Sequence, residues 1–329
     1  TTETAALLTF TIGGCAAKGL YWISIATGVV AVILLHEKRL LEGLATALPR
    51  HEMRTLLRFL LLTAVILPVV PNRDFTPFEI NPFKIWLVVV AVSGVSYVSY
   101  LMRMRWGEDR GLILAGLLGG AYSSTVTTVV LSRQSKKREP CAVGFAGAIV
   151  AATGMMYIRL WILLLLFAAP LAYRLTFLFW GMGVLAVIVG TLLARTISAD
   201  EECEFDPTIE RRDGNPLEMT SAFTFAAIFL AILVTTKVVA ERFGDTGVLI
   251  MAVIMGAADV DPFILGLTQT VGTGLTIETA ALAVVVAAAV NNLMKGVYAV
   301  VFGTRRTGRL SLVLLAALGG ISLIAFWLL

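Results

Sequence analysis

The amino-acid sequence predicts an all-α fold, a polytopic transmembrane helical bundle of about 9–11 segments, because its composition suits a membrane. Hydrophobic residues make up 58% of the 329 residues, charged residues make up 15%, and the mean hydropathy is +0.88. Apolar runs of roughly 17–25 residues recur, the length that crosses the hydrocarbon layer as a helix. The alternating ten-residue pattern of a membrane β-barrel is absent, so we expect the segments to be helices.

The apolar segments follow one another along the whole chain. We expect them at residues 3–17, 20–35, 56–70, 84–102, 111–133, 141–168, 174–194, 219–239, 246–269, 278–302 and 310–329. After the second segment, leucines recur at helical spacing among charged residues, at Leu40, Leu41, Leu44 and Leu48. This pattern predicts a helix on the membrane surface, which residues 46–80 complete and extend into a connecting span. Because the chain begins at Thr1 rather than Met, we also expect residues upstream.

Two stretches of the chain resemble each other. Residues 107–133 and 244–269 align without a gap, from Gly111 and Gly247 onward, at a constant offset of 136. The offset pairs Gly120 with Gly256, Ser123 with Asp259, Thr125 with Asp261, and Arg159 with Lys295. Helix breaks and basic residues that coincide at one offset predict an internal duplication.

The duplication divides the second part of the chain. Membrane repeat A is expected at residues 81–194 and membrane repeat B at residues 215–329, with a polar acidic loop at 195–214 between them. If every segment crosses, the basic loop residues divide almost evenly between the two sides. If 111–133 and 246–269 dip in and return, most basic residues lie on one side, which the positive-inside rule favours. Each repeat then keeps three crossings, so the copies are inverted, with interrupted helices near the midplane, as in many secondary transporters. A kinked segment that spans is the alternative.

The break in repeat B carries two carboxylates. In the stretch GAADVDP, Gly256 and Pro262 interrupt the helix, and Asp259 and Asp261 lie two residues apart. An unwound backbone would place both carboxylates on one side, and carboxylates inside a membrane commonly mark ion or proton paths. Paired hard oxygens suit Mg²⁺ or another cation, so Asp259 and Asp261 are the candidate metal ligands. Alternatively, Asp259 is the N-cap of a half-helix that begins at Pro262.

The break in repeat A carries hydroxyl groups instead. Gly119 and Gly120 precede Ser123, Ser124 and Thr125 in a segment that is otherwise apolar. Hydroxyl groups can satisfy the backbone groups that a helix break releases, although small residues also permit close helix packing. If the two breaks face each other, they form an asymmetric polar pocket with neutral oxygens on one side and charge on the other.

Four further polar residues lie deep in predicted spans. Arg159 and Lys295 are buried bases that need partners, and we expect them to pair with the two aspartates in a roughly neutral cluster. That pairing is either structural or functional, and bases with other partners could instead receive an anion. Asn291 and Asn292 add amide donors and acceptors one turn before Lys295 and are expected to belong to the site.

The motifs also resemble a known family. The first residues, TTETAALLTFTIGG, resemble the end of the MgtC/SapB membrane domain, so residues 1–45 look like its tail. The stretches GLLGGAYSSTVTTVVLSR, NPLEM, GAADVDP and NNLMKG resemble the uncharacterised multi-spanning domain that often follows MgtC/SapB in bacteria and archaea. The resemblance implies a multi-pass protein of the bacterial or archaeal cytoplasmic (inner) membrane. It ties the family to growth under low magnesium and to control of other membrane machines, without an accepted transport activity.

Together these features predict a membrane protein that binds, and transports or senses, a small ion at a midplane site. The ion is a cation or a proton, with Mg²⁺ one candidate, and no other cofactor is indicated. The alternative is a regulatory or accessory subunit that transports nothing and binds another membrane complex. Partners are therefore the bilayer, the ion, and a second copy or another membrane complex, but not nucleic acid.

Two kinds of chemistry are not indicated by the sequence. No nucleophile–base pair, HExxH motif, P-loop or dinucleotide fingerprint is present, so we expect no enzyme. Cys15, Cys141 and Cys203 lack paired spacing, so we expect neither a zinc site nor a disulfide framework.

Overall fold

The computed structural model describes residues 2–36, 50–75, 80–106, 111–195, 219–271 and 275–328. These residues are almost entirely helical, and their extended pairings are two isolated bridges, Phe75 with Ile80 and Val271 with Leu275. The predicted all-α class is therefore confirmed. The chain divides into two compact units, Thr1–Arg58 and Phe59–Leu329.

The first unit contains a helical hairpin. Helices α1 (Thr2–Ala17) and α2 (Tyr21–His36) are joined at Gly19, whose φ of +77° lies in the left-handed region that glycine adopts without strain. The Ser24 hydroxyl of α2 donates a 3.1 Å hydrogen bond to the Ile12 carbonyl oxygen of α1. Helix α4 (Arg50–Val69) begins in this unit and ends in the second. The predicted surface helix with Leu40, Leu41, Leu44 and Leu48 lies outside the described residues.

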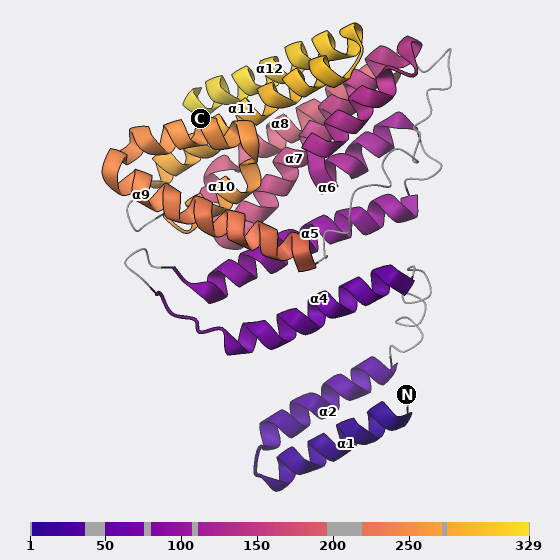
Figure 1. Ribbon diagram of the computed structural model, residues 1–329, viewed down its shortest axis with the longest axis vertical. Coiled ribbons are helices and arrows are strands. Elements are labelled where there is room, and N and C mark those ends of the chain that lie inside the picture. Colours follow the sequence, from indigo (N-terminus) through magenta and orange to yellow (C-terminus); the bar gives the residue numbers. More distant parts are fainter. Residues whose placement is uncertain are drawn as a thin grey trace. The chain divides into compact units, whose positions relative to one another are not determined.

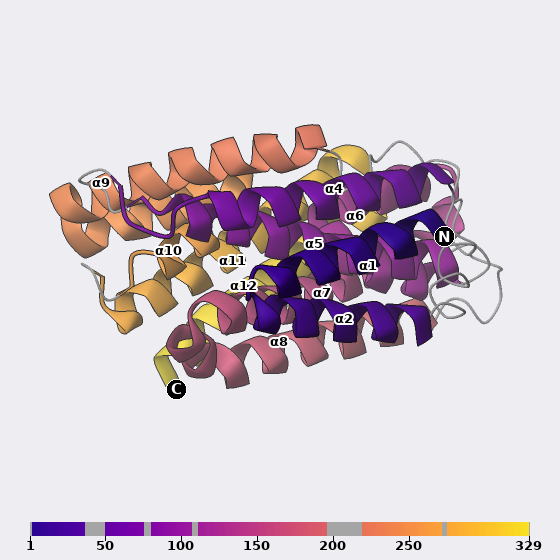
Figure 2. The same cartoon turned by 90° about the horizontal axis from the view of Figure 1, so that it is seen from below.

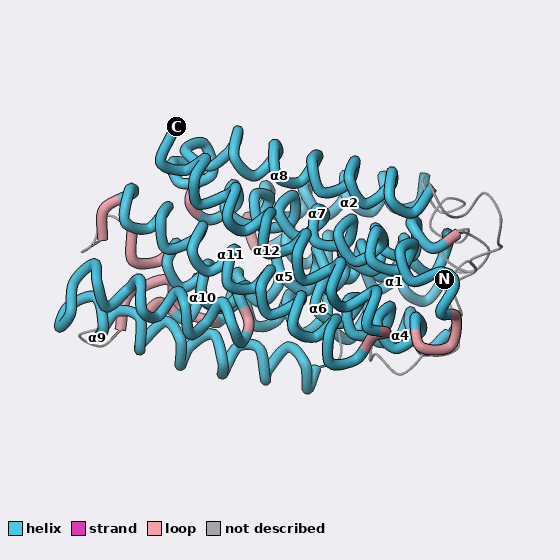
Figure 3. The backbone as a smooth tube through the Cα atoms, turned by 90° about the horizontal axis from the view of Figure 1, so that it is seen from above, coloured by secondary structure: helices cyan, strands magenta, loops and turns pink. Residues whose placement is uncertain are grey.

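The second unit contains the remaining helices (Figure 1). They are α5 (Pro82–Trp106), α6 (Leu112–Ser135), α7 (Ala142–Phe167), α8 (Ala169–Arg195), α9 (Met219–Ala258), α10 (Val260–Thr268), α11 (Ile277–Phe302) and α12 (Arg305–Leu328). A short 3₁₀ turn, Glu139–Cys141, precedes α7. The predicted loop at 195–214 lies outside the described residues apart from its first residue. Seen from below and from above, α8 and α9 lie toward opposite edges of this unit (Figures 2 and 3).

The predicted segments are confirmed as helices. The described residues contain seven helices that are long and apolar enough to cross a membrane, and α1, α2 and α4 are not among them. The segment predicted at 219–239 is the first arm of α9, and the segment predicted at 246–269 comprises the second arm of α9 and the nine-residue helix α10. The predicted separation of the two segments coincides with the backbone break at Gly244.

Small residues on α7 let its neighbours approach closely. A Cβ atom added at Gly154 would lie 2.7 Å from the Gly183 carbonyl oxygen of α8, which is closer than real Cβ contacts. Gly147 faces Gly190 of α8 in the same way. Close backbone approach at small residues is the usual source of helix association in lipid. As a result α7 lies at the centre of the second unit, with Tyr157 and Phe145 fully buried.

Helix α6 breaks in its middle and folds back on itself as a hairpin. Ser123 has extended backbone angles, φ −155° and ψ 104°, in the middle of the helix. A Cβ atom at Gly119 would lie 2.6 Å from the Thr127 hydroxyl oxygen, although eight residues of straight helix would separate them by about 12 Å. In the first arm, Leu112, Gly116 and Gly120 lie against Gly144, Ala148 and Ala152 of α7. The first arm therefore runs parallel to α7, and the second returns to the end where α7 begins.

The end of α9 and α10 form the equivalent hairpin in the second half. Helix α9 reverses at Gly244, whose φ is +56°, so that Gly247 contacts Val239 across the turn. The arm 245–258 then places Gly256 against Ala287 of α11. Asp259 breaks the helix with φ −144° and ψ 119°, close to the angles of Ser123, and lies 136 residues after it. The predicted breaks in both segments are confirmed.

The two halves of the second unit have opposite orientation. The Thr307 hydroxyl at the start of α12 donates to the Ala142 carbonyl oxygen at the start of α7, at 3.0 Å. At the other end, Arg174 of α8 pairs with Glu278 at the start of α11, at 3.1 Å. Since α7 begins where α11 ends, α7 and α11 are antiparallel, and the hairpins enter from opposite ends. The two hairpins therefore have the opposite orientations that an inverted repeat requires.

Candidate functional site

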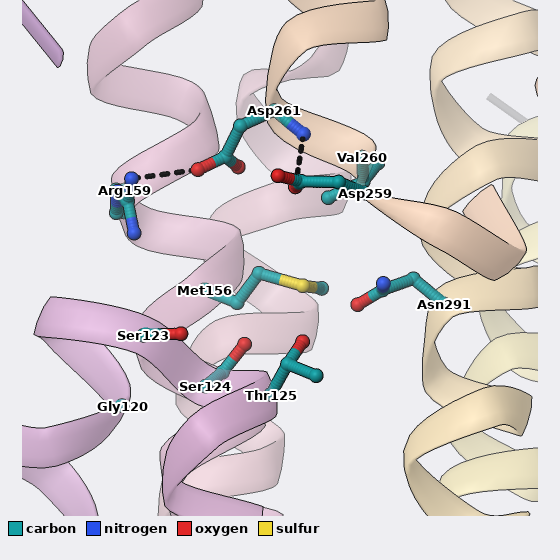
Figure 4. A pocket seen from close by; sticks show the side chains of 10 residues that line it. All are labelled: Gly120, Ser123, Ser124, Thr125, Met156, Arg159, Asp259, Val260, Asp261 and Asn291. Carbon is teal, nitrogen blue, oxygen red and sulfur yellow. Dashed lines mark hydrogen bonds and ion pairs between the residues drawn. The ribbon is translucent and has the colours of Figure 1, made fainter. Parts of the chain in front are cut away.

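The two helix breaks meet at one pocket. A cavity of about 40 Å³ lies between them (Figure 4), and it is lined by Gly120, Ser123, Ser124, Thr125, Met156, Arg159, Asp259, Val260, Asp261 and Asn291. Most of the residues that the sequence predicted as a site are thus brought together from segments more than 100 residues apart. The structure adds Met156 and Val260. The helix-break residues Gly119 and Pro262, and also Asn292 and Lys295, do not line the pocket.

Asp259 caps the helix that follows it. One of its carboxylate oxygens accepts a 3.3 Å hydrogen bond from the Asp261 backbone N–H, which the cut-off helix leaves without a helical partner. The N-cap interpretation is therefore correct, but the helix begins at Val260 rather than at Pro262. The Asp259 residue is also exposed. Its carboxylate can therefore cap α10 and still receive a ligand through its remaining lone pairs.

Arg159 joins the two hairpins. Its guanidinium contacts an Asp261 carboxylate oxygen at 2.6 Å and the Tyr122 carbonyl oxygen, at the end of the first arm of α6, at 2.7 Å. The same group lies 3.5 Å from the Ser96 hydroxyl of α5. The side chains of Arg159 and Asp261 are 13% and 17% exposed, so their attraction is only weakly screened. The predicted pairing of Arg159 with an aspartate is formed.

Lys295 does not pair directly with the aspartates. Its ammonium group is fully buried and donates to the Met156 sulfur at 2.9 Å, and no ion pair joins it to a carboxylate of the described residues. The expected pairing is therefore wrong for Lys295. Lys295 lies one helical turn after Asn291, so its side chain does not reach the pocket. It contacts the Met156 sulfur instead, and Met156 lines the pocket.

The two asparagines have different roles. The Asn291 side chain donates to the Gly256 carbonyl oxygen at 3.2 Å, and its buried Oδ1 has no partner within the described residues. Asn292 instead donates to the Tyr157 hydroxyl at 2.7 Å, inside the core. A buried acceptor without a partner is costly. The Asn292 Oδ1 also lacks a partner among the described residues, but only Asn291 lines the pocket. Asn291 therefore supplies an available oxygen to the pocket, and Asn292 joins α11 to α7.

The hydroxyl side of the pocket repeats the capping pattern of the acidic side. The Ser123 hydroxyl accepts a 3.4 Å hydrogen bond from the Val126 backbone N–H, as Asp259 accepts from Asp261. Ser124 and Thr125 follow it, and their hydroxyls point toward the break that carries Asp259 (Figure 4). The pocket thus has a neutral oxygen wall facing an acidic wall, which is the asymmetry that the sequence predicts.

The donor set only partly fits the predicted metal. Asp261 is engaged by Arg159, which leaves Asp259 and neutral oxygens for a cation. Within the described residues there is no group of three His, Cys, Asp or Glu side chains that could hold a metal ion. Mg²⁺ prefers octahedral oxygen coordination and keeps several waters. The pocket therefore suits a singly charged cation or a proton better than a dehydrated Mg²⁺ ion.

The cysteines differ from their prediction. Cys15 is free, whereas Cys141 is disulfide-bonded, so the expectation that the cysteines are unpaired is wrong for Cys141. Cys203 lies outside the described residues. Neither Cys15 nor Cys141 lines the pocket between the hairpins.

Comparison with known proteins assigns the chain to a family whose matched region includes the pocket. A family model described as a domain of unknown function, DUF4010, matches residues 90–303. An uncharacterized protein of Aquifex aeolicus (strain VF5) is 27% identical over 204 residues, which cover 62% of this chain and 87% of that protein. No solved structure matches. The chain belongs to the DUF4010 family, and the matched region contains both helix breaks, Arg159 and Asn291.

Proposed function

We propose that this multi-span membrane protein binds a small ion, a singly charged cation or a proton, between its two re-entrant hairpins, and transports or senses it. The volume of the pocket supports a small ligand. Sites for organic ligands usually measure about 300–1,000 Å³, whereas one water occupies about 30 Å³. A cavity of about 40 Å³ therefore has room for an ion and little else.

The observation that carries the proposal is the ion pair between Arg159 and Asp261. It neutralises the Asp261 carboxylate, and it links repeat A to repeat B. A cation or proton that reaches Asp261 competes with the guanidinium for the same carboxylate. Release of Arg159 would then weaken its contact with both hairpins. Occupancy of the pocket thereby changes the connection between the two inverted repeats.

The inverted arrangement could give the pocket an access route on each side of the membrane. One hairpin enters from the end where α7 begins and the other from the end where α11 begins, so each closes the pocket toward a different side. Inverted repeats with sites at broken helices support alternating access in many transporters. Asp259, Asn291 and the hydroxyls of Ser124 and Thr125 would complete the oxygen shell. Asp259 and Asp261 carry the charge that selects a cation.

Thermal unfolding of the purified full chain tests the proposal. A ligand that binds the folded state raises the unfolding temperature by mass action. We expect Na⁺, another monovalent cation or a change of pH to shift the wild type, and the shift to disappear in Asp261→Asn. Asp245→Asn, which removes an exposed acid at the turn of α9, is the matched control and should keep the shift. A wild-type protein that responds to none of these ions, to Mg²⁺ or to pH contradicts the proposal.

The alternative role as a regulatory or accessory subunit rests on the resemblance of residues 1–45 to the end of the MgtC/SapB domain. These residues lie in the first compact unit, separate from the unit that holds the pocket. A subunit of this kind should lose a co-purifying membrane complex when the acidic loop at 195–214 is deleted, whereas ion-dependent stabilisation should survive the deletion. Deletion of the loop therefore distinguishes a regulatory subunit from an ion-binding protein that acts alone.

A further inference from the structure

A second hollow, which shares no lining residue with the ion pocket, lies at the start of α12. It measures about 610 Å³ and is lined by Val143, Arg305, Arg306, Arg309, Leu310 and Val313. We refer to these six residues as the arginine groove. Its basic residues come from the first five residues of α12, and Val143 comes from the start of α7.

The arginines of the groove have no counter-charge among the described residues. Arg305, Arg306 and Arg309 are all exposed, and none forms an ion pair or hydrogen bond with a described side chain. Arg174, at the start of α8, is different because it pairs with Glu278. Three guanidinium groups within about one turn of helix repel one another, and an anion between them relieves that repulsion.

The groove continues into an apolar, exposed face. Arg309, Val313 and Ile324 recur on one side of α12, and Val313 and Ile324 are each 64% exposed. Because α12 is one of the helices long and apolar enough to cross the membrane, this face is expected to contact lipid. The arginines lie at the end of the span, where the headgroups of the bilayer begin.

We propose that the arginine groove binds an anionic phospholipid, with its phosphate between Arg305, Arg306 and Arg309 and an acyl chain along Val313 and Ile324. Guanidinium groups recognise phosphate through paired, charge-assisted hydrogen bonds. A free phosphate would leave the walls formed by Val143, Leu310 and Val313 without a partner. A zwitterionic lipid would bring a positive choline toward three positive charges.

The position of the groove agrees with this ligand. Lys136 and Lys137 lie at the same end of the bundle, because the Thr304 backbone N–H before α12 donates to the Ser135 hydroxyl at the end of α6, at 3.1 Å. The positive-inside rule assigns such a basic end to the cytoplasmic leaflet, where basic pockets between helices bind anionic headgroups. A lipid here would contact both α7 and α12.

Lipid binding to the delipidated full chain in detergent tests the proposal, measured by native mass spectrometry and thermal unfolding. The probes are phosphatidylglycerol, phosphatidylcholine with the same acyl chains, and inorganic phosphate. We expect phosphatidylglycerol to bind and to raise the unfolding temperature. We expect the double variant Arg306→Gln/Arg309→Gln to bind it about 30-fold more weakly, since each of the two basic residues near a headgroup contributes about 1 kcal/mol and about 1.4 kcal/mol is a factor of ten.

The matched control is Lys136→Gln/Lys137→Gln, which removes the same charge from exposed positions at the same end of the bundle. It should retain wild-type binding, and so should Asp261→Asn, because the groove does not depend on the ion pocket. Three results overturn the proposal: equal binding of phosphatidylcholine, equal stabilisation by inorganic phosphate, or equal losses in the two double variants.

Discussion

The two hairpins have the same backbone and different chemistry. Each breaks at equivalent residues, Ser123 and Asp259, with nearly the same backbone angles, and each break residue caps the arm that follows it. In α6 the cap is a hydroxyl, and before α10 it is a carboxylate. The comparison teaches that this hairpin backbone forms with either a neutral or a charged cap, so the turn itself does not require the carboxylates.

The equivalent basic residues show the same divergence. Arg159 reaches the pocket and joins Asp261 to the Tyr122 carbonyl oxygen, whereas Lys295 is fully buried against Met156. The first base belongs to a charge pair between the repeats, and the second does not form one with any described residue. Changes at equivalent positions of the two repeats should therefore have unequal effects wherever charge is involved, and equal effects wherever only packing is involved.

Removal of the two bases gives the largest expected contrast. Arg159→Met leaves the Asp261 carboxylate without its partner, and breaking a buried ion pair commonly costs about 3–5 kcal/mol. Lys295→Met replaces a buried base by an apolar side chain and should leave the free energy of unfolding unchanged or raise it. Reversible unfolding in mixed detergent micelles measures both. Equal destabilisation by the two substitutions contradicts the assignment of the pair.

Small residues at the hairpins give the next largest effect, and here the two repeats should agree. In Gly120→Ala and Gly256→Ala, the added Cβ atom would lie 2.5 Å from the nearest backbone atom of Ala152 and of Ala287, respectively. Overpacking of this kind costs about 1–3 kcal/mol. Gly181→Ala is the control, because nothing lies within 4 Å of that position and alanine favours a helix. A large loss in one hairpin alone would show that the two arms pack differently.

The capping residues give the smallest change in stability and the clearest functional difference. Ser123→Ala and Asp259→Ala each remove a cap worth about 1 kcal/mol. We expect similar losses of unfolding free energy but a loss of ion-dependent stabilisation only in Asp259→Ala. Thermal unfolding with and without the ion separates the two effects. If Ser123→Ala abolishes the ion response as fully as Asp259→Ala, the hydroxyl wall is as important as the acidic one.

Much of the fold follows from local signals in the sequence. The repeat and both breaks were predictable because glycines and polar residues interrupt apolar runs at one constant offset. The inversion was predicted separately, from the distribution of basic residues between the two sides. The interruption within α9 was predicted, since one segment was expected to end at 239 and the next to begin at 246, but the tight turn at Gly244 was not. Its left-handed backbone angle depends on how the arms pack, as the contact of Gly247 with Val239 shows.

The residue types of the site were predictable from the sequence, but which of the neighbouring side chains face the pocket was less so. Asn291 and Asn292 are neighbours in sequence, but one helical residue is a rotation of about 100°, and only Asn291 faces the pocket. The rotation of α11 is set by tertiary packing against α7, which no local pattern encodes. Met156 was missed for the same reason, although it is the repeat equivalent of Asn292, at the offset of 136.

Proximity of the hairpin tips tests the central claim most directly, because the two repeats form one ion pocket only if their breaks meet inside the membrane. In a background without native cysteines, the pair Ser124→Cys and Val260→Cys joins two residues that line the same cavity. The account predicts rapid oxidative cross-linking whose yield changes when the bound ion is added, while a pair of Ser124→Cys with Phe177→Cys, exposed on α8, stays uncross-linked. Failure of the first pair to cross-link in the folded protein, with or without ions, would contradict it.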